Sequence, residues 1–175
     1  MKKRNQEVLI KFNKTNELNS MMCTFEKEMN QIDDKYYLKE SENPYIYFLE
    51  HSNPKELVKK VKINDELNQI IEAIPVICVM SNSNYVVSTI LNKLRHKITY
   101  TDTFNITCHI NSYIYLDNKQ ELEQQITQTI KEFTRIAENK ENPQWDINIY
   151  IIGDITGISI KHDKNRKKDE IYNNF

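Results

Sequence analysis

The sequence predicts an α/β (α+β) protein made of two small units, a βαββα unit followed by an α/β unit with a mostly parallel sheet. Two observations predict this class. Apolar residues alternate between strand-like and helical spacing along the 175 residues, and the segment from Val76 to Met80 is apolar at every position, as a buried strand should be. The expected units are residues 1–64 and 65–162, and residues 163–175 read as a charged, disordered tail.

The first unit opens with a strand at Glu7 to Phe12, followed by a helix. The apolar positions of that helix are Leu18, Met21, Met22, Phe25, Met29 and Ile32. Two strands, Tyr36 to Lys39 and Tyr45 to Glu50, then form a hairpin around a turn-rich connection. A helix capped by Asn53 follows, so the order is most of a ferredoxin-like βαββαβ unit. Its last strand is short, absent or hidden between Lys62 and Leu67.

The second unit begins with an amphipathic helix that carries Leu67 and Ile74 and ends before Pro75, which starts the strand to Met80. Strands and helices then alternate, which implies right-handed crossovers and a mostly parallel sheet. The first expected elements are a helix capped within Ser81 to Asn84, a strand at Thr103 to Ile110 and an extended piece at Tyr113 to Leu116. A helix capped by Asp117 or Asn118 and reaching Ala137 follows. The last elements are a strand at Ile147 to Ile152, a turn at Gly153 to Gly157 and a strand at Ile158 to Lys161.

Composition excludes several classes of function. A net charge of -1 argues against coating nucleic acid through bulk positive charge, so RNA binding would have to be local. Only two glycines, Gly153 and Gly157, are present, and neither a Walker A loop nor a GxGxxG turn can be written with them. Cys23, Cys78 and Cys108 form no CxxC pair, so we expect reduced core thiols and neither a metal nor another cofactor. The lack of a long apolar run predicts a cytoplasmic protein without membrane contact.

Three segments carry a resemblance to a known family. ENPQWDINIYIIGDITGISI, from Glu141 to Ile160, resembles the C-terminal signature of THUMP domains. AIPVICVM (Ala73 to Met80) and TDTFNITCHI (Thr101 to Ile110) are similar to the family's first and middle strands, so the resemblance covers Leu67 to Lys161. The preceding βαββα unit is similar to the ferredoxin-like domain that commonly precedes THUMP domains in tRNA-modifying proteins.

The resemblance implies a non-catalytic adaptor. In the family, this pair of domains docks the acceptor end of tRNA while another domain performs the chemistry. The turn from Gly153 to Gly157 fits the standalone branch, whose members assist a separate tRNA cytidine acetyltransferase. The expected partners are therefore tRNA and that enzyme, and the oligomeric state stays open. One departure is that many THUMP domains carry basic residues after the middle strand, where this chain has Cys108 to Asn111.

Candidate RNA-binding residues fall into three groups. Cations that could neutralise phosphates are Lys93, Arg95, His96, Lys97, Lys161, Lys164 and Arg166. The alternative is that these cations only interact favourably with the negative end of the helix dipole and remain exposed to solvent. Ser81 and Ser83 could present amides and hydroxyls to a phosphate, or only cap their helix. Thr107 and His109 share one strand face, where His109 could contact a terminal nucleotide or serve as a structural histidine.

Three other functions compete with the adaptor hypothesis. The first is a small enzyme that uses His109, Cys108, Asp102 or Asp154 in acid-base or nucleophilic chemistry. Against it, Cys108 and His109 are neighbours on a predicted strand, so their side chains should point to opposite faces. The second is a protein-interaction module without RNA binding, and the third is a tRNA-modifying enzyme that lacks its catalytic domain.

Overall fold

The computed structural model describes residues 6–112 and 119–164. The strands are β1 (Gln6–Phe12), β2 (Tyr37–Glu40), β3 (Ile46–Glu50), β4 (Ile71–Met80), β5 (Thr103–Ile110), β6 (Ala137–Glu138), β7 (Trp145–Ile152) and β8 (Ile155–His162). The helices are α1 (Leu18–Ile32), α2 (Pro54–Ile63), α3 (Asp65–Ile70), α4 (Ser83–Leu94) and α5 (Lys119–Thr134). The expected extended piece at Tyr113 to Leu116 and the caps at Asp117 and Asn118 lie outside the described residues.

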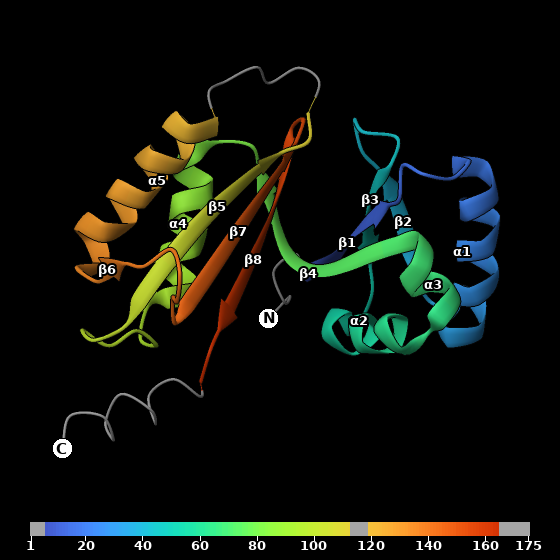
Figure 1. Cartoon of the computed structure of the whole chain (residues 1–175), viewed down its shortest axis with the longest axis horizontal. Coiled ribbons are helices and arrows are strands. Elements are labelled where there is room, and N and C mark those ends of the chain that lie inside the picture. The colour runs from blue at the N-terminus through green and yellow to red at the C-terminus, as the bar shows by residue number, and fades with distance from the viewer. Residues whose placement is uncertain (1–5, 113–118, 165–175) are drawn as a thin grey trace.

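The strands form one sheet in the order β2-β3-β1-β4-β8-β7-β5-β6 (Figure 1). The predicted α/β class is confirmed, but the sheet is mixed rather than mostly parallel. Within the described residues, only β5 pairs in parallel, with β6 and β7. The hairpin of β7 and β8 turns at Gly153 and Asp154, and a connection this short can join only antiparallel strands.

Strand β4 is shared by two halves of the molecule. The first half contains β1 to β3 and α1 to α3, and the second half contains α4, α5 and β5 to β8. The β4 residues Ile71 to Ile77 pair with β1, and Ile77 to Met80 pair with β8. The first part of β4 therefore completes the βαββαβ order, and the segment from Lys62 to Leu67 holds the end of α2, the connecting Asn64 and the start of α3 rather than a strand. The expected helix up to Ile74 is wrong, because helix α3 ends at Ile70. Pro75 is tolerated inside the strand because β8 pairs with β4 only from Ile77 onward, which leaves one side of Pro75 unpaired.

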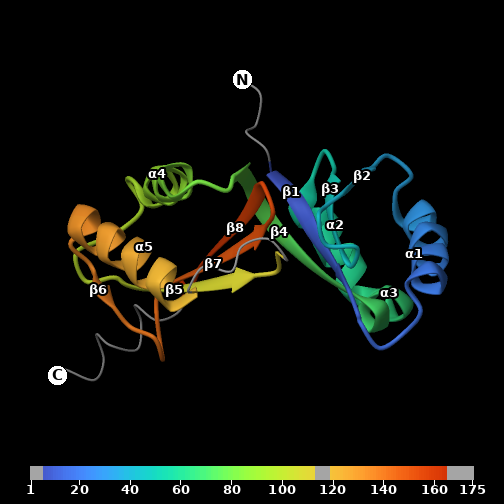
Figure 2. The same ribbon diagram turned by 90° about the horizontal axis from the view of Figure 1, so that it is seen from above.

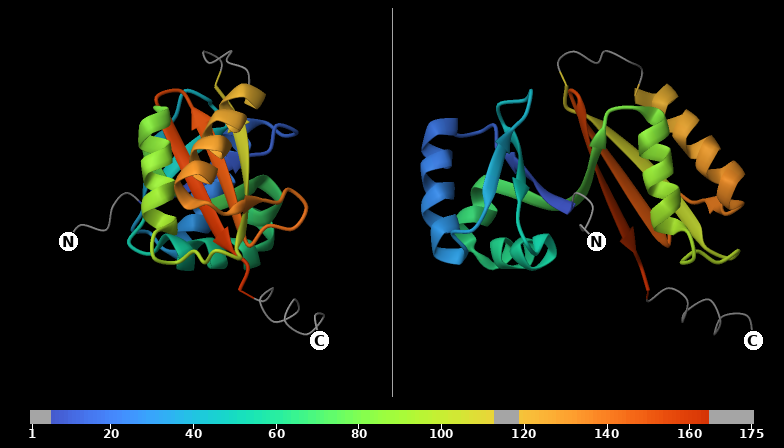
Figure 3. Two further views of the ribbon diagram at one scale, coloured as in Figure 1. Left: turned by 90° about the vertical axis from the view of Figure 1, so that its left-hand side faces the viewer. Right: turned by 180° about the vertical axis from the view of Figure 1, so that it is seen from behind.

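All five helices pack against the same face of this bent sheet. Helices α1, α2 and α3 cover β1, β3 and the start of β4 with one apolar cluster. Helices α4 and α5 cover β5, β7 and β8 with another. Figure 2 shows the two helical groups at opposite ends of the sheet, and the left view of Figure 3 shows α4 and α5 in front of their strands. The other face carries no helix of the described chain, and we call it the helix-free face.

The helix-free face has an apolar centre where the two halves meet. It is built from Leu9, Ile46, Phe48, Ile74, Val76, Cys78, Tyr150 and Ile152. Gly157 lies within β8 at this centre rather than in the predicted turn, since β8 already begins at Ile155. A Cβ atom on Gly157 would lie 3.3 Å from the Val76 side chain, so a glycine allows β8 to approach β4 closely here.

Two predicted helix caps are confirmed, and a second predicted helix end is wrong, in addition to that of α3. The side chain of Asn53 accepts a hydrogen bond from the Glu56 amide, and Asn82 caps α4 by accepting one from Asn84. Helix α5 ends at Thr134, and Ala137 lies in β6 instead.

Within residues 6–112 and 119–164, no helix combines the length and apolar character that a membrane span requires.

Candidate nucleic-acid interface

Six candidate side chains gather at one end of the second half. Lys93 lies on the last turn of α4, and Arg95, His96 and Lys97 follow it, all three exposed. Lys161 and Lys164 are exposed at and beyond the end of β8, at the same end of the sheet (Figure 1). We call this set the cationic end; its members are Lys93, Arg95, His96, Lys97, Lys161 and Lys164. None of its five Lys and Arg side chains forms an ion pair with a described carboxylate, so their charges remain available to phosphates.

Buried contacts fix the backbone around the cationic end. Asp102 is 1% exposed and accepts hydrogen bonds from the Thr99 amide, the Thr99 hydroxyl and Trp145 Nε1. The Trp145 indole stacks on His162 with 4.1 Å between ring centroids. The loop after α4 and the end of β8 are thereby held to the same tryptophan. Trp145, the first residue of β7, therefore has a packing role.

His96 adopts a left-handed backbone with a φ of 66°, in the turn that ends α4. This conformation lets the amides of Lys97 and Ile98 bond to the Leu94 carbonyl, but a residue with a Cβ pays a steric cost there. We expect His96→Gly to raise the free energy of unfolding by about 0.5–1 kcal/mol, measured by urea denaturation. His96→Ala keeps the Cβ atom and should bring no gain. A destabilised glycine variant would contradict the prediction.

Thr107 and His109 lie together on the helix-free face, whereas α4 lies on the other face of the sheet. His109 stacks on Tyr150 with ring centroids 4.6 Å apart and an interplanar angle of 9°. Its Nε2 lies 3.0 Å from Asn148 Oδ1, while the Asn148 amide donates to Asp146. Since that amide nitrogen already donates, the oxygen is the acceptor and His109 Nε2 the donor. The stacking on Tyr150 and the hydrogen bond to Asn148 hold the His109 ring in place, and the other edge of the ring remains available to a ligand.

The structure adds functional candidates that the sequence interpretation missed. A cavity of about 340 Å³ opens between the halves, beside the unpaired side of β4. Polar groups in its lining come from both halves: Asn13, Lys62, Asn68, Glu72, Tyr150 and Lys161. Burial, then the charges of Glu72 and Asp146, raise the pKa of Tyr150 to about 12, so its hydroxyl stays protonated. The sequence did carry a signal for this surface. In β7 the polar residues Asp146, Asn148 and Tyr150 alternate with isoleucines, which indicates that they lie on the helix-free face.

Ser81 and Ser83 lie far from the cationic end. They flank the start of α4, whose 12 residues span about 18 Å. The Ser81 hydroxyl lies 2.9 Å from that of Thr156, and its amide bonds to Asp154. Ser83 is exposed at the opposite end of the helix from Lys93. The structure thus separates Ser81 and Ser83 from the cationic end, whereas Lys161 lines the same cavity as Tyr150, on which His109 stacks. Arg166 lies outside the described residues.

The geometry gives no support to nucleophilic chemistry at Cys108. The thiol is fully buried on the helix-covered face, whereas His109 points to the other face. Burial, and then the negative charge of Glu123, raise the pKa of Cys108 to about 12, so a thiolate does not form near neutral pH. Asp102 is occupied by its three hydrogen bonds, and Asp154 is exposed. In the described part of the chain no cluster of side chains could hold a metal ion.

The three cysteines differ in exposure, which gives a direct labelling prediction. Cys78 and Cys108 are buried as expected, but Cys23 is exposed on α1 rather than in the core, and all three are free. Burial also raises the pKa of Cys78. We expect a thiol reagent to label one cysteine rapidly in the native protein and the other two only after unfolding. Cys23→Ser should abolish the rapid phase, and a rapid phase that survived it would contradict the burial of Cys78 and Cys108.

Known proteins resemble this chain in structure. No protein-family model and no curated protein sequence matches it. PH1313 from Pyrococcus horikoshii Ot3 matches with a TM-score of 0.71 at 12% identity, over 89% of this chain and 54% of that one. A 4-thiouridine synthetase solved as an RNA complex with bound ATP matches with a TM-score of 0.60 at 14% identity, over 90% and 41%.

TrmN from Thermus thermophilus matches with a TM-score of 0.53 at 6% identity, over 88% of this chain and 45% of that one. The chain thus spans about half the length of these solved structures. Each match extends over most of the chain and therefore includes both halves. At these identities the comparisons show the fold alone, and the chain has the THUMP-like α/β fold that the sequence resemblance implied.

Proposed function

We propose that the protein is a non-catalytic RNA-binding adaptor that docks the acceptor end of tRNA for a separate modification enzyme, a tRNA cytidine acetyltransferase. The observation that carries the proposal is the cationic end on a THUMP-like fold. Its five Lys and Arg side chains, which form no ion pair within the described residues, give a protein of net charge -1 a local site for phosphates. The match to a synthetase solved with RNA supports nucleic acid as the ligand.

The two surfaces of the interface suit different parts of an RNA. Lysine and arginine at the cationic end would hold the backbone, which positions a nucleic acid without reading its sequence. The helix-free face offers Asn105, Thr107 and His109 as hydrogen-bonding groups, all half-buried. Such groups can contact unstacked bases, which are found at single-stranded ends. A duplex stem that leads into a single-stranded end presents both kinds of contact, and the acceptor end of tRNA has this form.

The adaptor role is supported by the state of the reactive side chains. Cys108 is buried and protonated, and Asp102 has a structural role in the loop after α4. The proposal therefore assigns the chemistry to another protein. We expect the purified chain to leave tRNA unmodified alone and to raise the rate of cytidine acetylation when added to the acetyltransferase. Modification of tRNA by the isolated chain would overturn the non-catalytic role.

A binding titration with total tRNA tests the RNA-binding step. The titration is repeated across a salt series and with tRNA that lacks its 3′ end. We expect saturable binding that falls with salt, because counterions are released from the neutralised phosphates. Trimming of the 3′ end should weaken it further. An absence of binding even at low salt would overturn the proposal and favour a protein-interaction module. That alternative is motivated by the lack of basic residues from Cys108 to Asn111, after the middle strand.

A further inference from the structure

The cavity between the two halves is bordered by a strand edge that has no partner strand. Strand β4 pairs with β8 only from Ile77 to Met80, so its earlier part has a neighbour on one side alone, which is β1. The stretch from Ile71 to Pro75 lines the cavity of about 340 Å³, and Tyr150 and Lys161 line it from the second half. The cavity therefore lies where two strands of one sheet diverge.

The hydrogen bonds of β1 show which residue of β4 directs its backbone groups into this cavity. The Phe12 amide donates to Tyr45, on the side of β1 that faces β3. In an antiparallel ladder, hydrogen-bonded pairs alternate with pairs that are not hydrogen-bonded. The register therefore makes Lys11 and Glu72 a hydrogen-bonded pair. It turns the amide and carbonyl of Ala73 away from β1, toward the cavity.

Ala73 offers the cavity a hydrogen-bond donor and an acceptor. The residue is only 7% exposed, and neither backbone group bonds to another residue of the ranges 6–112 and 119–164. Buried backbone groups are rarely left without a partner, which indicates that water or a ligand occupies this place. The edge does not extend further, because the Ile71 amide already donates to Leu67 and Pro75 has no amide. It is too short to pair with a peptide strand and fits one small planar group.

The charges around the cavity indicate a second feature of the ligand. Lys62 of α2 and Lys161 of β8 are exposed and line the cavity from the two halves. Neither forms an ion pair with a described carboxylate, whereas Glu72, the acidic residue of the lining, is paired with Lys11. The two lysines therefore favour an anion. A planar, hydrogen-bonding group that carries an anion is the chemistry of a nucleotide.

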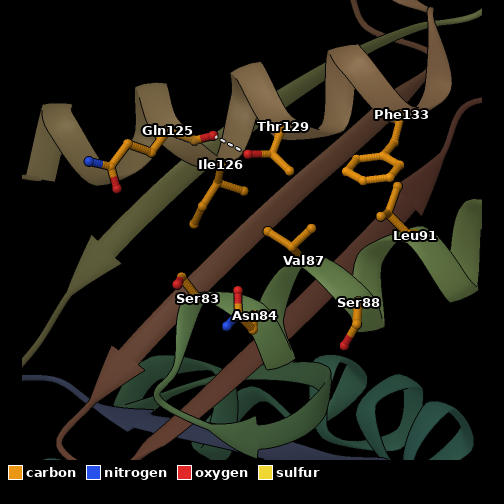
Figure 4. Close-up of a pocket in the computed structure, with 9 residues that line it drawn as sticks. All are labelled: Ser83, Asn84, Val87, Ser88, Leu91, Gln125, Ile126, Thr129 and Phe133. Carbon is orange, nitrogen blue, oxygen red and sulfur yellow. Dashed lines mark hydrogen bonds between the residues drawn. The ribbon is translucent and has the colours of Figure 1, made fainter.

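Another cavity of similar size lacks both features. It lies between α4 and α5, encloses about 310 Å³ and has no charged residue in its lining (Figure 4). Its walls are helices, whose backbone groups bond within each helix, so they present no open strand edge. Nothing there would hold a phosphate or meet the edge of a base.

We propose that the cavity between the halves binds a single unpaired nucleotide, with the Ala73 amide and carbonyl at the edge of its base and Lys62 and Lys161 at its phosphate. An unpaired base exposes donors and acceptors along its Watson–Crick edge, which a strand edge can meet. The site needs no glycine-rich loop, because side chains hold the phosphate. The inference deepens the proposed function and rests on it for RNA as the source of the nucleotide. A free mononucleotide has the same chemistry.

NMR of the full chain at the Ala73 amide tests the site directly. The probes are adenosine and cytidine 5′-monophosphates, adenosine without phosphate, and a short single-stranded RNA. We expect a probe that binds to shift the Ala73 amide signal and to slow the exchange of this amide with solvent. The dissociation constants come from the same titrations.

A charge reversal in the lining separates the phosphate from the base. Lys62→Glu should weaken the mononucleotides by at least about tenfold and leave the binding of adenosine unchanged, since adenosine has no phosphate. Lys60→Glu is the matched control, because Lys60 is an exposed lysine of the same helix that forms no ion pair with a described residue and does not line the cavity. It should bind every probe as the wild type does.

The variant Ala73→Pro removes the amide that faces the cavity and costs no ladder bond to β1. Pro75 already occupies the equivalent position two residues later. We expect at least about tenfold weaker binding of adenosine and of the mononucleotides alike. Urea denaturation shows whether the variant is folded, and the wild-type Ala73 signal decides the question if it is not.

The outcomes separate this inference from the proposed function. A shift of the Ala73 amide by RNA but not by mononucleotides supports the site with RNA as its ligand. A shift by mononucleotides in a protein that binds no tRNA at any salt concentration supports a site for free nucleotides and overturns the proposed function. If tRNA binds but no probe changes the Ala73 amide, the inference is wrong and the proposed function stands.

Discussion

Reversal of two charges at the cationic end, in the double variant Lys93→Glu with Lys97→Glu, should weaken tRNA binding by at least about tenfold. Each lysine that neutralises a phosphate releases counterions from the RNA, and a glutamate in its place adds repulsion to the lost contact. The slope of log affinity against log salt should therefore become less steep, by about 0.7–0.9 for each contact that is lost. A titration at several salt concentrations measures both quantities.

The control for this variant carries the same change in charge at a distant place. Lys35 follows α1 and Lys55 lies on α2, both on the other side of the molecule from α4 (Figure 1). Both side chains are exposed and neither forms an ion pair with a described carboxylate, so the replacement of both by glutamate should leave the fold intact. If the control pair weakens tRNA binding as much as the first pair does, binding follows the net charge of the whole protein. The cationic end would then lose its special role.

The sequence predicted helices and strands correctly where the spacing of apolar residues and the capping residues indicate the same element. The α1 stripe, the Asn53 cap and the strand from Val76 to Met80 are all present in the structure. The run is not buried throughout, however, because Met80 is 67% exposed. The helical spacing of Leu67, Ile70, Ile71 and Ile74 predicts a helix that extends over the start of β4. Pairing with β1 along Ile71 to Ile77 decides the conformation instead, and a long-range contact of this kind cannot be seen in a local window.

The candidate site was predictable only in part, for a related reason. The cations of α4 and its following loop are close together in the sequence, so their clustering needed no tertiary information. Their position at the same end of the sheet as Lys161 depends on the packing of Trp145 against Asp102 and His162. The cavity between the halves depends on the separation of β4 from β8 before Ile77, along Ile71 to Pro75, and the local pattern does not specify that separation.

A buried carboxylate on the helix-free face gives the largest expected effect on stability. Glu7 is 6% exposed, and Lys39 Nζ lies 2.6 Å from its Oε1 and 3.0 Å from Glu50 Oε1. Within the described residues, the other Glu7 oxygen is buried without a hydrogen-bond partner. Lys39→Met would leave this carboxylate buried and unpaired, so we expect a loss of about 3 kcal/mol in urea denaturation. The single variant Glu50→Gln removes only an exposed partner and should cost far less.

A double variant separates the ion pair from the packing of its side chains. Glu7→Leu with Lys39→Met replaces both charges by apolar groups, which should recover most of the stability that Lys39→Met loses. A double variant as unstable as Lys39→Met would mean that the packing of the Lys39 stem, and not the stranded charge, stabilises this edge of the sheet.

The pH dependence of stability gives an independent check on the same ion pair. Burial lowers the pKa of Lys39, but hydrogen bonds and charge from Glu7 and Glu50 outweigh it and hold the pKa above its ordinary value of 10.5. Because the pKa is raised in the folded state, the contribution is complete below pH 10.5 and is lost as the pH rises through the folded pKa. Unfolding measured at rising alkaline pH should therefore show a fall in wild-type stability. The fall should be smaller in Glu7→Leu with Lys39→Met, and an equal fall in both proteins would assign it to other groups.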